Sequence, residues 1–274
     1  GVDAFSRMES NGGAFVYCSD RDRFQEATNP FYWDFELYTK DLKGGKITRL
    51  TKTYNDREMA PSISDDGKRV VYMLDRFART NMSLYWLDTD KPSERHLLFN
   101  NMDKKTFATI APDGKYVYFN QEDAPGSGSY DIYRIALDTL VEENLTNTKG
   151  ISELHADVSG DGKTICYERH FRVPDAGSEK LGADDPNHPN QLFEIYTLDV
   201  ASRKVTRITH NEIGDGFASI SADGQWIVFQ SARKNLDKEP GKDFELFAIK
   251  ADGKSTEWQI SSKKQSHDFV NVGF

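Results

Sequence analysis

The stretch "SISDDGKRVVY", residues 62–72, combines an alternating apolar segment, an Asp-Gly turn and a second apolar segment. An Asp-Gly pair between two such segments is a strong hairpin signal, because glycine adopts a positive φ without a steric penalty. The pattern returns as "TIAPDGKYVYF" (109–119), "DVSGDGKTICY" (157–167) and "SISADGQWIVF" (219–229). The chain is therefore built from copies of one unit, whose turn glycines are Gly67, Gly114, Gly162 and Gly224.

Each copy continues with two more short segments that alternate between apolar and polar residues. The third segments read "SLYWLD", "DIYRIALD", "EIYTLD" and "ELFAIK", and the fourth read "RHLLF", "EENLT", "VTRIT" and "TEWQIS". Alternation with period two is typical of half-buried strands, and no segment has a helical period. The sequence predicts an all-β chain of four-stranded antiparallel blades.

Two partial copies remain at the ends of the chain. Near the N-terminus, "GGAFVYCSD", "ELYTKD" and "ITRLT" match second, third and fourth strands, whereas "DFVNVGF" (268–274) resembles a first strand. We expect residues 268–272 to pair beside the N-terminal strands, because closing the ring removes exposed sheet edges. The predicted fold is a five-bladed β-propeller in a single domain, 1–274, with blades at 12–52 plus 267–274, 58–100, 105–147, 153–210 and 215–262.

The repeat, written "S-x-DGk-x-vvy…elY-x-ld…r-LT", resembles the WD40-like repeat of the TolB type over essentially the whole chain. The segment "YCSDRD" (17–22) also resembles the usual ending of the second strand of that repeat. The resemblance implies a propeller but leaves the function open, since this repeat serves periplasmic scaffolds, peptidase propeller domains and some lyases alike. It further implies an exported, periplasmic protein, although the start "GVDAFSRMES" contains no visible signal peptide.

Composition excludes several classes of protein. The formal net charge of −9 argues against a general nucleic-acid binder, which needs a basic face. No apolar run approaches the roughly 20 residues of a membrane helix, so we expect no membrane insertion. Cys18 and Cys166 each lie in an apolar strand and are expected to be buried free thiols. We expect a monomer.

The connections between second and third strands are long, and long loops on a rigid scaffold often carry function. Aligning the repeats places Arg21, Arg76, Asp123, Phe171 and Arg233 at one position in these loops. Three arginines predict a partly cationic ring that grips a carboxylate or phosphate, unless each pairs with an acid of a neighbouring blade. Tyr32 and Trp33, in the first such loop, suit contact with a protein or a sugar, or pack under a neighbouring loop.

The same alignment places a polar residue at the start of each first strand, near the predicted channel. These residues are Glu58, Lys105, Glu153, Asp215 and His267. Glu58, Glu153 and Asp215 are candidate catalytic residues, because two carboxyl groups can divide the acid and base roles of glycoside hydrolysis. The alternative is a polar rim without chemistry.

Histidines on the same predicted face offer a second kind of site. His155, with His170, His188 and His267, could gather there, and the resemblance implies that some propellers of this type hold a metal through histidines. No compact ligand motif is present, so no cofactor is assigned; a divalent metal held by His155 and His267 is the alternative to isolated histidines.

These observations leave two functions open. The leading hypothesis is a non-enzymatic binding or scaffold module whose loop-rich face docks a protein segment or a glycan. The alternative is a carbohydrate-active enzyme, either a glycoside hydrolase or a metal-dependent lyase, with its site at the mouth of the central channel.

Overall fold

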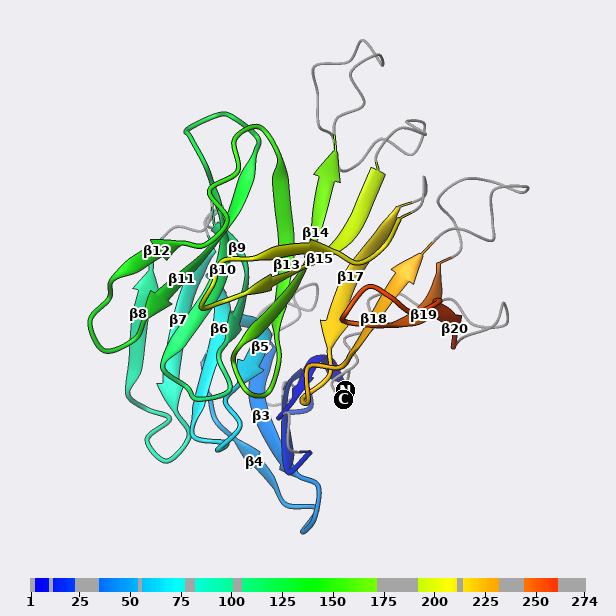
Figure 1. Cartoon of the computed structure of the whole chain (residues 1–274). Helices are drawn as coiled ribbons and strands as arrows, with labels where there is room; N and C mark the ends of the chain where they lie inside the picture. Colours follow the sequence, from blue (N-terminus) through cyan, green and yellow to red (C-terminus); the bar gives the residue numbers. More distant parts are fainter. Residues whose placement is uncertain are drawn as a thin grey trace. The chain divides into compact units, whose positions relative to one another are not determined.

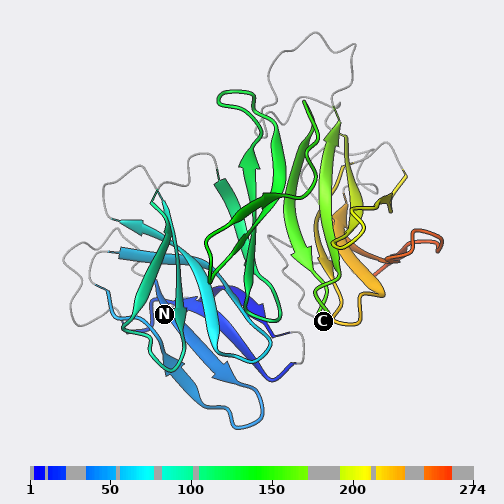
Figure 2. The ribbon, with the colours of Figure 1, turned by 60° about the vertical axis from the view of Figure 1, so that its left-hand side comes forward.

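The structure is a computed structural model of the chain. It describes residues 3–9, 12–22, 35–53, 56–76, 82–100, 105–171, 192–210, 214–231 and 244–260. These residues form strands and no helix, and the strands belong to five antiparallel sheets of four strands each (Figures 1 and 2). The sheets are the blades of a five-bladed β-propeller, which confirms the predicted fold class.

Within each sheet, strands adjacent in sequence are hydrogen-bonded neighbours. The first blade contains β1 (Asp3–Met8), β2 (Ala14–Ser19), β3 (Glu36–Asp41) and β4 (Ile47–Arg49). The second contains β5 (Asp56–Ile63), β6 (Arg69–Arg76), β7 (Ser83–Asp88) and β8 (Arg95–Phe99). The third contains β9 (Lys105–Ile110), β10 (Tyr116–Glu122), β11 (Tyr130–Ala136) and β12 (Glu142–Asn144). The fourth contains β13 (Ser152–Val158), β14 (Thr164–Phe171), β15 (Leu192–Asp199) and β16 (Val205–Arg207). The fifth contains β17 (Asp215–Ile220), β18 (Trp226–Ser231), β19 (Glu245–Lys250) and β20 (Trp258–Gln259).

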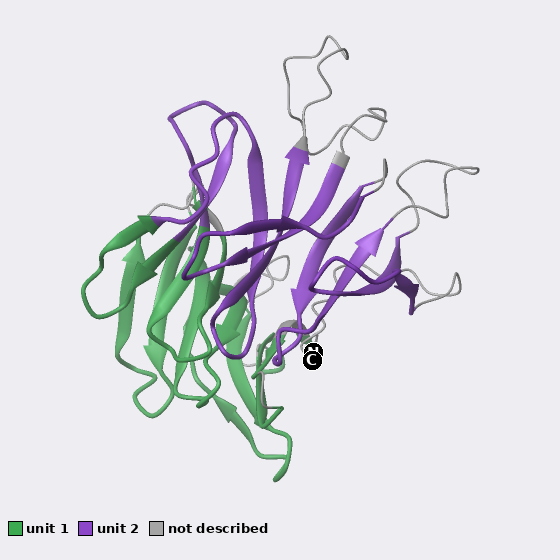
Figure 3. Cartoon of the chain, in the orientation of Figure 1, with its two compact units in different colours: residues 1–119, 134–143, 273–274 green, residues 120–133, 144–272 purple. Residues whose placement is uncertain are grey.

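The chain divides into two compact units, each with its own apolar core (Figure 3). The first unit, green in the figure, comprises residues 1–119, 134–143 and 273–274, and the second, purple, comprises 120–133 and 144–272. Cys18 lies in the core of the first unit and Cys166 in that of the second. Both are buried free thiols, as predicted. The assignment of 1–274 to one domain stays a prediction.

The Asp-Gly turns have the predicted geometry. Their glycines have φ angles between 68° and 71°, the left-handed region that a side chain disfavours. A serine three residues before the glycine adds two hydrogen bonds, as Ser64 illustrates: its Oγ donates to Asp66 (2.7 Å) and accepts from the Arg69 amide (3.0 Å). Ser159 and Ser221 repeat this arrangement. The third blade has Ala111 at this position and lacks both bonds.

The predicted ring closure is wrong at the first blade. β1 supplies the first strand and pairs antiparallel with β2, with Asp3 opposite Ser19 and Met8 opposite Phe15. β2 pairs with β3 on its other edge, so neither edge of β2 is left for residues 268–272. Those residues lie outside the described part of the chain. The first blade therefore starts at Asp3, not at residue 12.

The first strands share a bulge that directs one side chain away from the regular pleat. Register shifts interrupt the pairing of β1, β5, β13 and β17 with their second strands. Ala60, Phe107, His155 and Phe217, at one repeat position, have positive φ angles of 46° to 54°. Positive φ in residues other than glycine is uncommon, and bulges often lie near functional sites. Among the described residues there is no helix that could span a membrane.

Candidate functional site

The three carboxylates predicted at the starts of first strands are all fully buried. Glu58, in β5, accepts a hydrogen bond from Thr53 Oγ1 at 3.0 Å. Burial, reinforced by the neighbouring charge of Glu36, raises the pKa of Glu58 to about 8. The carboxyl group therefore holds its proton at neutral pH, and it holds it out of contact with solvent.

Glu153, in β13, repeats this arrangement in the second unit. Thr148, again five residues earlier, donates its hydroxyl to Glu153 Oε1 at 3.3 Å, and Arg169 Nε donates to the same oxygen at 2.9 Å. Burial raises the pKa of Glu153, against the opposing charge of the guanidinium. Asp215, in β17, is buried at the corresponding place. Glu58 and Glu153 are thus hydrogen bonded to neighbouring residues of the same chain, and all three acids are shielded from solvent.

The remaining members of that set also have partners or fall outside the described residues. Lys105 Nζ pairs with Glu142 Oε2 at 3.1 Å and lies over the rings of Phe99 and Phe119. Burial lowers the pKa of Lys105. Because β1 is the first strand of the first blade, Asp3 occupies the place that the alignment gave to His267, which lies outside the described residues.

Of the three predicted loop arginines, the structure describes one side chain. Arg21 donates from Nη2 to Asp3 at 2.9 Å and lies about 5 Å from the ring centroids of Tyr17 and Tyr38. The arginine therefore pairs with an acid of its own blade, rather than with an acid of a neighbouring blade. The side chain of Arg76, and Arg233, Tyr32 and Trp33, lie outside what the structure describes, so their binding role stays a prediction.

The structure adds a cluster of titratable groups around Glu168, a residue of β14 that the sequence analysis did not single out. Glu168 Oε1 contacts His155 Nδ1 at 2.6 Å and His170 Nε2 at 3.1 Å, and Oε2 accepts the Phe217 amide at 2.8 Å. Burial by itself raises the pKa of Glu168, but the charges and hydrogen bonds of the two histidines outweigh it and lower that pKa to about 2. The His155 ring also stacks on Phe217, with the centroids 4.3 Å apart.

Of the four histidines in the predicted site, the structure describes His155 and His170, so the metal site stays a prediction. His155 and His170 share one carboxylate, whereas His188 and His267 are not among the described residues. In the described ranges, no group of three histidine, cysteine or acidic side chains is arranged to hold a metal ion. The pairing fixes the orientation of both imidazole rings.

Glu168 has a counterpart in the third blade that explains its position. Asn120, six residues after its turn glycine as Glu168 is after Gly162, donates Nδ2 to the Glu153 carbonyl at 2.8 Å and accepts the His155 amide at 3.3 Å. Each side chain therefore ties its second strand to the bulge of the following first strand. The sequence signal for this role was a polar residue six positions after the turn glycine, where the apolar run of the second strand ends.

A cavity of about 510 Å³ lies in the second unit, between the β10–β11 loop and the β12–β13 loop. One wall carries Asp123, Ala124, Ser127 and Ser129, and the other carries Asn144, Asn147, Lys149 and Gly150, with Asp131 and Tyr133 contributed by β11. The volume is within the range of roughly 300–1,000 Å³ typical of small-molecule sites. Among these residues, only Asp123 was a predicted site residue.

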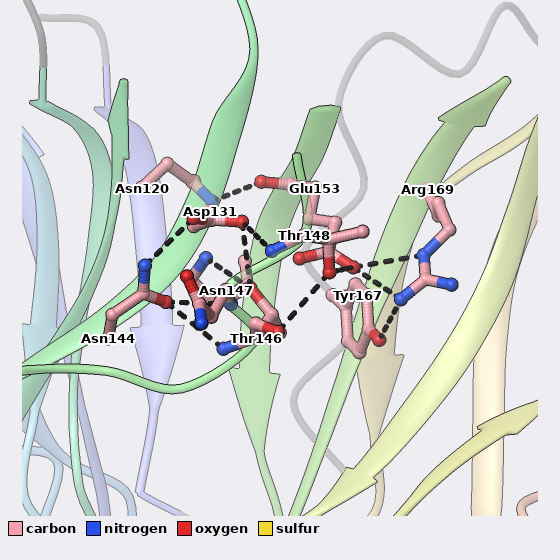
Figure 4. Close-up of polar contacts among 10 residues, drawn as sticks. Asn120, Asp131, Asn144, Thr146, Asn147, Thr148, Glu153, Tyr167 and Arg169 are labelled. Carbon is pink, nitrogen blue, oxygen red and sulfur yellow. Dashed lines mark hydrogen bonds and ion pairs between the residues drawn. The ribbon is translucent and has the colours of Figure 1, made fainter. Parts of the chain in front are cut away.

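Figure 4 shows that one wall of this cavity belongs to a continuous hydrogen-bond network. Asp131 accepts from Asn144 Nδ2 and from the Thr148 amide, both at 2.8 Å. Thr148 in turn donates to Glu153, which also binds Arg169. The network fixes the cavity wall before any ligand arrives, which lowers the entropy cost of binding.

Comparison by sequence assigns no family. No family profile matches the chain. An uncharacterized protein, Atu1656, of Agrobacterium fabrum is 34% identical over 68 residues, which cover 25% of this chain and 21% of that protein.

Three solved structures are similar over most of the chain. A putative TolB from Agrobacterium tumefaciens has a TM-score of 0.64 at 20% identity, covering 94% of this chain and 80% of its own. TolB from Acinetobacter baumannii has a TM-score of 0.61 at 20% identity, and this chain, matched over 92%, spans 52% of it. An oligogalacturonate lyase from Vibrio parahaemolyticus has a TM-score of 0.63 at 14% identity, with coverages of 97% and 67%. At these identities the likeness is one of fold, a TolB-like β-propeller.

Proposed function

We propose that this TolB-like β-propeller is a non-enzymatic binding or scaffold module whose loop-rich face docks a protein segment or a glycan. One observation carries the proposal: Glu58 and Glu153, the acids placed for catalysis, are fully buried and hydrogen bonded by their own chain. A general acid or base must come within hydrogen-bond reach of its substrate. Side chains with no exposed surface suit a structural role instead.

The arrangement around each acid supports this role. Glu58 and Glu153 each accept a hydrogen bond from a threonine five residues earlier, so each binds the segment that leads into its own first strand. Glu153 additionally holds Arg169 of the neighbouring second strand. The same device in two blades is what a repeat uses for stability, whereas a catalytic centre needs unlike residues at one place.

A second function remains a candidate because of one electrostatic observation. Burial raises the pKa of Glu58 to about 8 and also raises that of Glu153, and a protonated carboxyl near neutral pH is what a general acid requires. The oligogalacturonate lyase of similar fold is an enzyme on the same scaffold. The candidate is therefore a carbohydrate-active enzyme.

One experiment separates the two functions. The protein is incubated with a broad panel of oligosaccharides, released reducing ends and unsaturated products are measured, and the same protein is applied to glycan and peptide arrays. We expect ligand capture without turnover for the wild type and for Glu153→Gln. Turnover that Glu153→Gln abolishes, while an exposed control such as Glu94→Gln keeps it, would replace the binding proposal with the enzymatic one.

The acidic net charge of −9 is consistent with ligands other than nucleic acid.

We propose in addition an exported, periplasmic location, which the resemblance of the repeat to TolB implies. Fractionation of a cell that produces the full-length protein, probed with an antibody to this chain, tests the location. Recovery only with cytoplasmic markers would contradict it.

A further inference from the structure

The cavity between the β10–β11 and β12–β13 loops is a formed site to which no ligand has been assigned. All its lining residues lie between Asp123 and Gly150, in one continuous described stretch and in one compact unit. From the charges and hydrogen-bonding groups of these lining residues, we propose that the cavity binds a neutral saccharide. The inference rests on the proposed binding function and specifies its ligand.

The charges lining the cavity favour a neutral ligand. The lining contains two carboxylates, Asp123 and the buried Asp131, and one ammonium group, Lys149. An anionic ligand would be repelled by the two carboxylates. A cationic ligand would compete with the hydrogen-bond donors that already bind these carboxylates. Asp131 is bound by Asn144 and the Thr148 amide, and Asp123 by the Ser127 hydroxyl.

The hydrogen-bonding groups favour a ligand rich in hydroxyls. A carboxylate offers about four lone-pair directions, so the partly exposed Asp123 retains acceptor capacity after its bond from Ser127, whereas the buried Asp131 is occupied within the wall. The exposed amide of Asn147 offers a donor and an acceptor together, and Asn144 keeps a second amide hydrogen after Nδ2 binds Asp131. A sugar hydroxyl both donates and accepts, and therefore matches such a mixed lining better than a group that only donates or only accepts.

The lining also distinguishes a sugar from a peptide segment. Peptide recognition concentrates its energy in apolar or aromatic anchors that fill pockets. Among the lining residues, Ala124 and Tyr133 carry the apolar side chains, and Lys149 adds its methylene groups. One aromatic ring beside polar groups suits the C–H face of a single pyranose ring, whereas an anchoring peptide side chain would find no aliphatic pocket.

Both walls are pre-organised. In the β10–β11 loop, Asp123 donates its amide to the Ser129 carbonyl at 2.9 Å, and Ser152 Oγ binds the Gly128 carbonyl at 3.0 Å. In the opposite wall, Asn144 Oδ1 accepts the Asn147 amide at 2.9 Å. A rigid site offsets the weak affinity that is usual when a sugar exchanges hydrogen bonds with water.

The test measures sugar binding by saturation-transfer NMR and calorimetry. The sugars are glucose, galactose, mannose, N-acetylglucosamine, cellobiose and maltose, each at up to about 10 mM. Asn147→Gly removes one lining side chain and keeps the left-handed backbone, since Asn147 has a φ of 48°. Leu140→Gly is the matched control, an exposed residue with a φ of 56° that does not line the cavity. Asp123→Asn and Lys149→Ala complete the set.

We expect at least one of these sugars to bind, with Asn147→Gly and Asp123→Asn each weakening the affinity about tenfold, the value of one hydrogen bond. Leu140→Gly and Lys149→Ala should change the affinity less than about twofold, and salt should have little effect. Absence of binding by all six sugars overturns the inference. So does strong dependence on Lys149 and salt, which indicates a charged ligand, and so does array capture of peptides only.

The two proposals fail in different ways. If the arrays capture a glycan or a peptide and Asn147→Gly leaves that capture unchanged, the binding function stands and the cavity is not its site. If an oligosaccharide binds in the cavity and is turned over, the non-enzymatic function falls while the ligand class stands.

Discussion

Replacing Glu58 with glutamine should stabilise the protein at neutral pH, because the amide keeps the shape of a protonated carboxyl group without its ionisation. The Glu58 pKa is about 8 in the folded state and 4.5 in the reference state that stands for the unfolded chain. The folded protein therefore retains a proton that the unfolded chain releases. The contribution of Glu58 to stability is therefore highest below pH 4.5, falls as the pH rises toward 8 and then levels off.

The magnitude follows from this difference in pKa. Each pKa unit is worth 1.36 kcal/mol, so at pH 7 the retained proton of Glu58 costs the wild type about 3 kcal/mol that it does not cost below pH 4.5. Glu58→Gln should recover most of that loss, since Gln Oε1 still accepts the bond from Thr53. For a chain of this size the gain corresponds to roughly 5–10 °C in melting temperature at pH 7.

The assay is thermal unfolding of wild type and variant, followed by tryptophan fluorescence and calorimetry from pH 4.5 to pH 8. The difference between the two proteins should be near zero at pH 4.5 and grow with pH. Glu94→Gln, an exposed acid, is the control and should show no such growth. A variant that is less stable than the wild type at pH 7 would refute the reasoning, because it would mean that the ionised Glu58 stabilises the fold.

Three further predictions concern the contacts between and within blades. Glu168→Gln should cost roughly 3 kcal/mol at pH 7, because the Glu168 pKa of about 2 contributes stability above pH 4.5 that is lost as the pH falls toward 2; a loss in melting temperature that is equally large at pH 2.5 would contradict this. Gly216→Ala should lower the melting temperature, since the new Cβ would lie 2.6 Å from Glu168 Oε2 and break the bond to the Phe217 amide; an unchanged melting curve would show that the carboxylate moves freely. Ser159→Ala should cost about 1 kcal/mol in urea unfolding by removing two turn hydrogen bonds, whereas Ala111→Ser should gain a similar amount; opposite signs would mean that the serine does not stabilise the turn.

Local sequence patterns were sufficient for most of the blade architecture. The Asp-Gly turns set the position of each hairpin, and the alternation of apolar residues set which side of each strand is buried. Both signals act over a few residues, so copies can be aligned without knowing their neighbours in space. The same alignment assigned Glu58, Glu153 and Asp215 to equivalent positions in their blades. Their pairing with the second strands agrees: they lie opposite Leu74, Arg169 and Ser231.

The first blade was mispredicted for a local reason. β1 reads "DAFSRM", in which a bulge between Ala4 and Arg7 interrupts the alternation that marks a strand. Its turn uses Gly12, with a φ of 69°, in place of an Asp-Gly pair. The C-terminal "DFVNVGF" matched the expected pattern better and was given the position that Asp3–Met8 occupies.

The sequence by itself determined the number of blades, their turns and their apolar cores, because these depend on hydrogen bonds and burial within a short stretch of chain. Only the tertiary structure decided the state of the polar residues. Glu58 is buried and protonated, Glu168 is buried and ionised, and the difference lies in what packs against each: a threonine and another acid in one case, two histidines in the other. Burial and neighbouring charge are set by residues that the fold brings together, and these decide whether a carboxyl group supports the fold or meets a ligand.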